Sequence, residues 1–130
     1  MTTTFKTHIK KEDLSIMEEL LHQSNYQISE LEALCRAEIF DYDVEFEVYP
    51  PGESYPSYFR VHYHLFSEFV DTYFSDNNIE SYLTDQDYYV MKNDEVDRMS
   101  GMYWYQNLAS EKEQLEVTNY AINQLFTSIF

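Results

Sequence analysis

The chain has 130 residues, and 44% of them are hydrophobic. Its 24 acidic residues outnumber its 8 basic ones, which gives a formal net charge of −16 at pH 7. This hydrophobic content can form a packed core and excludes a wholly disordered chain, whereas the charge argues against direct binding to DNA, RNA or an anionic membrane, because those partners attract positive charge.

The length predicts a single domain over residues 1–130. No apolar stretch resembles a secretory signal, and no run approaches the ~18 apolar residues of a transmembrane helix. Cys35 is the only cysteine, so no disulfide can form within the chain. We therefore expect a reducing, cytoplasmic location.

Two helices are predicted in the first third of the chain. Residues 11–23 have the hydrophobic period of an amphipathic helix. Its apolar side consists of Leu14, Met17, Leu20 and Leu21. After a short break, Ser29 is placed to cap a second helix over residues 30–39, with Cys35 on its apolar side.

The stretch FDYDVEFEVY, residues 40–49, alternates between apolar and acidic side chains. The apolar set is Phe40, Tyr42, Val44, Phe46 and Val48, and the acidic set is Asp41, Asp43, Glu45 and Glu47. A period of two predicts a half-buried strand with the two sets on opposite faces. Residues 57–66 alternate as well, beyond a loop at residues 50–56, so we predict an antiparallel β-hairpin with strands at about 40–49 and 57–66. A helix from residue 56 onward is the alternative, because several aromatic residues there also share a helical side.

Helical periods dominate the rest of the chain. The predicted elements are, in order, a helix over 66–74, a break at 76–78, one helical turn at 79–83, a short strand at 87–91, a helix over 94–106 and a last helix after Ser110. Ser110 and Glu113 have the spacing of a capping box at the start of that last helix. The sequence thus predicts an α+β fold, a small helix-rich single domain with a hairpin packed on helices; an all-α fold is the alternative.

The acidic set of residues 41–47 is the main candidate binding site. At ~3.3 Å per residue its four acids extend over roughly 20 Å, a spacing similar in scale to that of phosphates along a nucleic-acid strand. A strand face that serves only solubility usually mixes both signs, but this one contains no lysine. Residues 12–97 also carry 21 acids against 3 bases, a repulsion that does not help folding. The alternative is a solvated face that protects a sheet edge from aggregation.

Further acids and tyrosines extend the predicted binding surface. The full set of predicted partner-binding residues is Asp41, Asp43, Glu45, Glu47, Tyr49, Glu53, Tyr55, Glu68, Asp71, Asp76, Glu80, Asp85 and Asp87. Tyrosines in loops or polar surroundings are good interface anchors, because they are large, stiff and amphipathic. Those predicted to be accessible are Tyr49, Tyr55, Tyr58, Tyr88, Tyr89, Tyr103 and Tyr105.

The sequence predicts no catalytic residue, metal site or cofactor, and the chain is not expected to be an enzyme. The spacing His62-x-His64-x3-Glu68 resembles the first metal motif of cupins, but the flanking glycines and a second histidine motif are missing. An EF-hand loop that begins at Asp76 would need a glycine where Ser81 stands. Phosphate-binding glycine loops and hydrolase motifs are absent from the sequence as well.

In size and charge, though not in any motif, the chain resembles the small acidic inhibitors that phages and mobile elements use against host defence, such as anti-CRISPR and anti-restriction proteins that mimic DNA. The resemblance implies a protein that occludes the positively charged nucleic-acid site of a nuclease or CRISPR effector, without contacting nucleic acid or membrane itself. The alternatives are an immunity protein that neutralises a basic toxin nuclease, an acidic secretion chaperone, and a metalloenzyme that uses His62 and His64. The sequence leaves the oligomeric state open.

Overall fold

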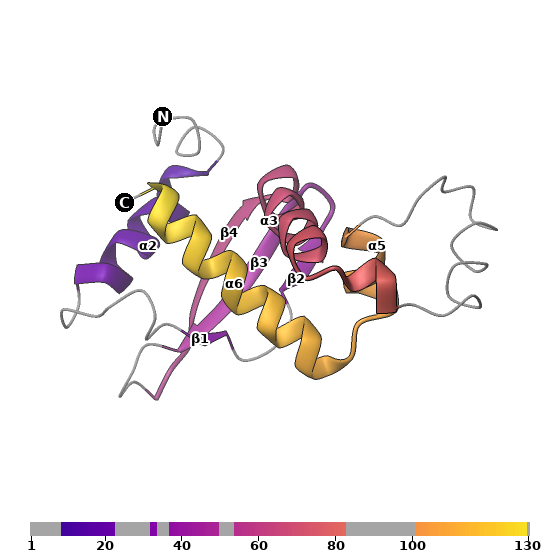
Figure 1. Cartoon of the computed structure of the whole chain (residues 1–130). Coiled ribbons are helices and arrows are strands. Elements are labelled where there is room, and N and C mark those ends of the chain that lie inside the picture. The colour runs from indigo at the N-terminus through magenta and orange to yellow at the C-terminus, as the bar shows by residue number, and fades with distance from the viewer. Residues whose placement is uncertain (1–8, 23–31, 34–36, 50–53, 83–100, 130) are drawn as a thin grey trace.

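A computed structural model describes residues 9–22, 32–33, 37–49, 54–82 and 101–129 (Figure 1). Its elements are α2 (Lys11–His22), β1 (Glu32–Ala33), β2 (Glu38–Phe40), β3 (Asp43–Tyr49), β4 (Ser57–His62), α3 (Tyr63–Asp76), the 3₁₀ helix η2 (Ile79–Tyr82), α5 (Gly101–Asn107) and α6 (Glu111–Ile129). The α+β class is confirmed, with a β-hairpin packed on helices. Cys35, the predicted strand at 87–91 and residues 94–100 of the helix predicted over 94–106 lie outside the described residues, whereas the rest of that helix is observed as α5.

Strand β3 is the centre of an antiparallel sheet. Along one edge it pairs with β4, and along the opposite edge it pairs with β2 and then β1, because Val48 has both Ser57 and Ala33 as partners. Glu32 of β1 pairs with Tyr49, whereas Glu38 of β2 pairs with Glu45. The two short strands therefore do not follow one continuous register along β3, and the register shifts by two residues between them. The helix predicted over residues 30–39 is therefore wrong. This segment supplies the strands that satisfy the backbone groups on the second edge of β3.

The beginning of the strand predicted over 40–49 is a tight turn. Phe40 pairs with Asp43, so Asp41 and Tyr42 form a two-residue connection between β2 and β3. Asp41 has a φ of 48°, in the left-handed region that Asp tolerates better than most residues. Paired residues lie on the same side of a sheet, so Phe40 shares a side with Asp43 and not with Val44.

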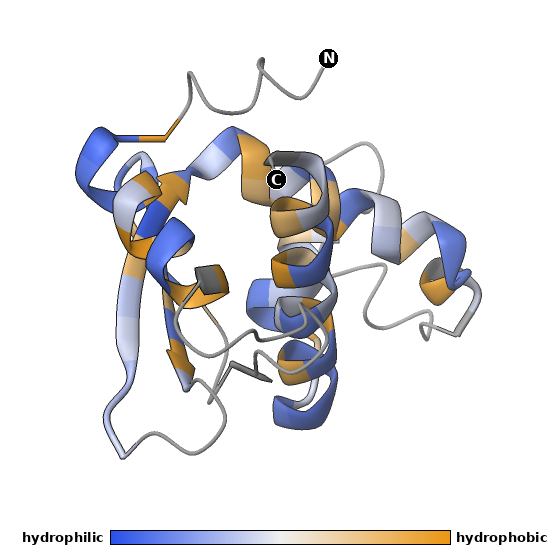
Figure 2. Cartoon of the chain, turned by 90° about the vertical axis from the view of Figure 1, so that its left-hand side faces the viewer, coloured by the Kyte–Doolittle hydropathy of each residue, from blue (hydrophilic) through white to orange (hydrophobic). Residues whose placement is uncertain are grey.

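One side of the sheet forms the core with the helices. Val44, Phe46 and Val48 of β3 are buried, as the alternation predicted. In Figure 1, α6 crosses this side of the sheet with α3 beside it. Figure 2 shows the hydrophobic residues of α6 on the side that faces the sheet, where the ring centroid of Phe126 lies 5.7 Å from that of Phe59 in β4. We call this side of the sheet the inner face.

Helix α6 begins as the sequence predicted. The Ser110 N–H donates to Glu113 Oε1 at 2.8 Å, and the Glu113 N–H donates to Ser110 Oγ at 3.2 Å, which is a complete capping box. The side of the helix that faces the core includes Thr118, Ile122, Leu125 and Phe126, which are all buried. The residues of this segment alone were therefore enough to predict the helix.

Helix α3 begins earlier than predicted, so the strand over 57–66 is correct only as far as His62. The His62 ring is the N-cap: its Nδ1 accepts a hydrogen bond from the His64 N–H at 3.1 Å. From there the burial follows a helical period through Leu65, Phe66, Val70 and Phe74. Residues 62–66 fit the period of a strand as well as that of a helix. The His62 cap and the packing of this segment against the core favour the helix.

Helix α2 protects the outer edge of β4. Asp13 Oδ1 accepts a hydrogen bond from the Arg60 backbone N–H at 3.0 Å, which satisfies a group that points away from β3. Met17 and Leu20 are buried beside it, on the apolar side that the sequence predicted. A helix that covers an edge strand removes a template for pairing with other chains.

A buried polar chain connects the sheet with α5 and α6. The Ala37 N–H donates to the Tyr105 hydroxyl at 2.9 Å, and this hydroxyl lies 2.7 Å from Thr118 Oγ1. Thr118 Oγ1 also donates to the Gln114 carbonyl at 2.8 Å, which extends the chain into the backbone of α6. Tyr105 is fully buried, so its predicted role as an accessible anchor is wrong.

Replacing Tyr105 with phenylalanine is expected to lower the free energy of unfolding by about 1–3 kcal/mol, because the buried Ala37 N–H loses its acceptor. Urea unfolding measures this change. Tyr73→Phe is the matched control, since that hydroxyl lies 3.5 Å from Glu116 at the surface, and we expect a change below about 0.5 kcal/mol. Equal losses in the two variants would contradict the role given to the buried chain.

Candidate functional site

The candidate site is the side of the sheet that points away from the core, which we call the outer face. Side chains alternate along a strand, so the residues of β3 between the buried ones point away from the core. Paired residues share a side of the sheet, so their partners on β2 and β4 point the same way. The outer face consists of Glu38, Phe40, Asp43, Glu45, Glu47, Tyr49, Tyr58, Arg60 and His62.

Three of the four acids of the predicted row lie on this face. Asp43, Glu45 and Glu47 occupy alternate positions of β3, each partly buried, and cover about 13 Å at ~3.3 Å per residue. Asp41 is exposed in the adjoining turn and does not belong to the strand. The row is therefore shorter than the sequence predicted.

The fold brings two basic side chains to the row. Lys10 Nζ lies 3.4 Å from Asp43 Oδ2, and Arg60 Nε lies 3.2 Å from Glu45 Oε2. The expectation of unmixed negative charge is thus wrong for the folded face, although ion pairs this exposed add little to stability. Glu38 lies directly opposite Glu45, so two like charges face each other across the strands. The outer face keeps an excess of acids over these bases.

Exposed aromatic side chains gather around the same face. In the described ranges, four large hydrophobic side chains are exposed: Phe40 (37%), Tyr42 (78%), Tyr55 (79%) and Tyr58 (47%). Phe40 and Tyr58 are on the outer face, and the other two lie in the connections at either end of β3. Exposed aromatic groups concentrated on one surface are typical of an interaction site.

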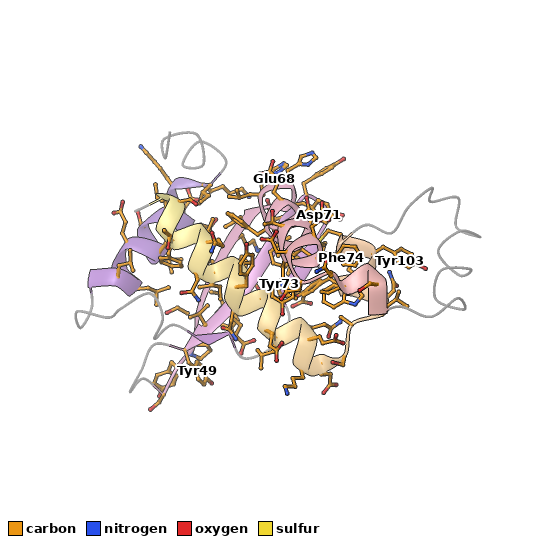
Figure 3. All side chains as sticks on the ribbon, viewed as in Figure 1. Tyr49, Glu68, Asp71, Tyr73, Phe74 and Tyr103 are labelled. Carbon is orange, nitrogen blue, oxygen red and sulfur yellow. The ribbon has the colours of Figure 1, made fainter. Side chains whose placement is uncertain are left out.

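The structure separates the acids of α3 from the row. Glu68, Asp71 and Asp76 are exposed on this helix, which packs against the inner face. Figure 3 shows Glu68 and Asp71 well away from Tyr49, which ends β3 on the outer face. The predicted site residues therefore divide into at least two surfaces.

Some predicted site residues have other positions or other roles. Tyr55 is exposed in the bend before β4. Asp71 Oδ1 accepts a hydrogen bond from the Gly101 N–H at 2.8 Å, so this carboxylate also fixes the start of α5. Glu80 belongs to η2. Glu53, Asp85 and Asp87 lie outside the described residues.

Sequence reasoning missed several residues on or beside the outer face. Phe40 and Tyr42 were placed among the buried apolar residues, Glu38 was assigned to a helix, and Lys10 is distant in sequence. Only Arg60 carried a usable signal, because a hairpin with the observed register puts it opposite Glu45.

The two histidines of the cupin-like spacing do not share a strand face. Strand β4 ends at His62, and His64 lies in the first turn of α3 with its ring stacked on that of His62 at 5.3 Å. Within the described ranges, no group of three His, Cys, Asp or Glu side chains is arranged to hold a metal ion. Asp76 and Asn77 end α3, where the Asn77 N–H donates to the Tyr73 carbonyl and the Asn78 N–H donates to the Ser75 carbonyl, each at 3.1 Å.

Two tyrosines of α3 have shifted acidities. Burial raises the pKa of Tyr63 above its ordinary value, and the Asp71 carboxylate raises it further. Burial also raises the pKa of Tyr73, with additional contributions from Glu116 and Glu113. A raised pKa keeps both phenols neutral at neutral pH, which does not favour either as a base or nucleophile.

A depression of about 990 Å³ lies between β2 and the junction of α5 and α6. Its lining mixes apolar groups such as Ile39 and Leu115 with polar and charged groups such as Gln106 and Lys112. These groups do not form a nucleophile–base pair or another recognisable catalytic arrangement. We therefore regard the outer face as the stronger candidate.

Comparisons with models of known protein families, with curated proteins and with solved structures found no match. Among the helices that the structure describes, none has the length and apolar character needed to cross a membrane.

Proposed function

We propose that the protein is a small acidic binding protein that uses its outer face to occupy the positively charged nucleic-acid site of another protein. It acts as a nucleic-acid mimic and needs no catalytic group. The observation that supports this function best is the coincidence, on one side of the sheet, of a line of carboxylates with the exposed aromatic side chains.

The charge of the whole chain favours a basic partner. At −16 it attracts a positively charged surface over a long range and steers association. The carboxylates of β3 recur every ~6.6 Å, a spacing that a surface built to contact successive phosphates can accommodate. Tyr58 and Phe40 add contact area that a charge pattern alone does not provide.

The proposed partners are cytoplasmic nucleases and nucleic-acid-guided effectors, and a toxin nuclease blocked by its immunity protein belongs to the same class. All these partners hold their nucleic acid in a channel lined by lysine and arginine. A protein seated in such a channel blocks activity by occlusion.

Affinity capture from a lysate at low salt, with mass spectrometry of the retained proteins, tests this function. We expect a nucleic-acid-binding protein that is released at about 0.5 M salt, because salt screens exposed charges. Added DNA or RNA should displace it, and the protein should in turn inhibit its binding to nucleic acid. A partner that resists salt and is not displaced by either nucleic acid would contradict the proposal.

A further inference from the structure

Strand β2 has one edge that bonds to β3 and one that faces away from it. The Ala37 N–H, just before β2, points along the second edge, because it donates to the Tyr105 hydroxyl at 2.9 Å. Backbone groups alternate in direction along a strand, so the N–H and the carbonyl of Ile39 point the same way. The pairing agrees, because Phe40 pairs with Asp43 at the two-residue turn and such a turn closes with a hydrogen-bonded pair.

The outward backbone groups of Ile39 are open in the part of the chain that the structure describes. No described residue outside β2 forms a hydrogen bond with them. In the same ranges no helix covers this edge as α2 covers that of β4. An uncovered edge of this kind is a template on which an extended segment can be added as a further strand.

The depression of about 990 Å³ lies against this edge. Its lining includes Ile39 and, from α6, Leu115, and both side chains are partly buried against the core. Its size is at the upper end of that of ligand pockets, which are about 300–1,000 Å³. A residue paired with Ile39 in an added strand would share its side of the sheet, so an apolar side chain there could enter the depression.

The charges beside the edge favour a basic occupant. Glu38 lies next to Ile39 on the outer face and forms no ion pair with a described residue. The depression itself is lined by Glu38 and Glu111 against one base, Lys112. The residues before and after the apolar one in an added strand would point to the outer face, and one of them would lie opposite Glu38. A second copy of the chain is disfavoured, because each copy carries −16.

We infer that the free edge of β2 binds an extended segment of a partner protein, in which an apolar residue paired with Ile39 lies between two basic residues. Main-chain hydrogen bonds to Ile39 hold the segment, and Glu38 selects its charge. The inference goes beyond the proposed function, because it adds a contact that depends neither on the carboxylates of β3 nor on mimicry of nucleic acid.

A short peptide with the sequence Ser-Lys-Val-Lys-Ser, titrated to saturation into isotope-labelled protein, tests the inference by NMR. We expect hydrogen exchange of the Ile39 amide to slow at least about tenfold, because this N–H enters a hydrogen bond. The Ala37 amide is an internal control that should change little, since it already donates to Tyr105.

Two modifications test whether main-chain bonds hold the peptide. Methylation of the valine nitrogen in the peptide removes the donor to the Ile39 carbonyl and should weaken binding at least about tenfold. Ile39→Pro should abolish binding and keep the fold, because the N–H that it removes does not bond to β3. Ile39→Val is the matched control and should bind normally. If the proline variant does not fold, the methylated peptide still decides, because it leaves the protein unchanged.

A further pair of variants tests the selection of charge. Glu38→Gln should weaken the lysine peptide about threefold, as expected for one exposed ion pair. Glu18→Gln, which removes an exposed acid from α2, has the same net charge and should bind as the unmodified protein does. A peptide with glutamate in place of both lysines should not bind measurably.

Three results would overturn the inference. The first is equal affinity of the methylated and unmethylated peptides, and the second is unchanged exchange of the Ile39 amide when the lysine peptide is bound. The third is a dimer of the chain in sedimentation that Ile39→Pro dissociates, because a second copy would then occupy the edge. None of these results bears on the carboxylates of β3, so the capture experiment tests the proposed function independently.

Discussion

Replacing Gly101 with alanine is expected to lower the free energy of unfolding by about 3 kcal/mol, at the upper end of the cost of overpacking a core. A Cβ at this position would lie 2.8 Å from the Cα and 3.0 Å from the backbone nitrogen of Asp71 in α3. Because these are backbone atoms, α3 cannot relieve the contact by a change of rotamer. Helix α5 would have to move, and the hydrogen bond from the Gly101 N–H to Asp71 Oδ1 would be lost.

Urea unfolding of Gly101→Ala measures the loss, and Ser75→Ala provides the control. Ser75 is exposed on the same α3 helix, and its substitution should change stability by less than about 0.5 kcal/mol. A Gly101→Ala protein as stable as the unmodified chain would show that α5 does not need this close approach to α3. A glycine in a helix is otherwise a disadvantage, so the contact explains its presence.

The elements that the sequence predicted well are those specified by neighbouring residues. Helix α6 follows from the Ser110–Glu113 capping box and from an apolar period that continues for several turns. Helix α2 and the centre of α3 follow from the same period. In each case the hydrogen bonds lie within the element, so the local pattern contains the necessary information.

The errors lie where distant segments decide the structure. Residues 38–40 have a helical pattern, but they pair with β3 because that strand has a second edge to satisfy. The turn at Asp41 and Tyr42 could not be recognised in the sequence, because a two-residue turn leaves the alternation of apolar and acidic residues uninterrupted. Its effect is that of a one-residue slip: it moves Phe40 from the inner to the outer face.

The candidate site was predictable in part. Alternation alone placed Asp43, Glu45 and Glu47 on one side of a strand. Their counter-ions depend on the tertiary fold, since Lys10 comes from the segment before α2 and Arg60 from the paired strand. Tyr55 and Tyr58 were predicted to be accessible, whereas the exposure of Phe40 and Tyr42 depended on the turn between β2 and β3. Charge was therefore easier to predict than the surface that presents it.

The largest functional effect is expected from reversing two outward charges together, Glu38→Lys with Glu47→Lys. We expect the affinity for the captured basic partner to fall by at least about 100-fold, because like charges placed together at an interface cost several kcal/mol and each 1.4 kcal/mol is tenfold. Folding should be little affected. Neither acid forms an ion pair with a described residue, and a lysine at position 38 would face Glu45 with the opposite sign.

The matched control reverses two exposed acids elsewhere, Glu18→Lys on α2 with Asp76→Lys on α3. Each pair of substitutions changes the formal net charge by four units, from −16 to −12, so long-range steering is weakened to the same extent. A lysine at the C-terminal end of α3 also suits the helix dipole. We expect this control to lose less than about fivefold in affinity, mainly through slower association.

The comparison of the two doubly substituted proteins decides what the acidity does. A loss confined to the first protein, and seen mainly as faster dissociation, means that the outer face itself contacts the partner. Equal losses in both, seen mainly as slower association, would mean that total charge guides the encounter while the contact lies elsewhere. Unchanged affinity in both would remove the electrostatic basis of the proposed function, and the acids would then serve solubility.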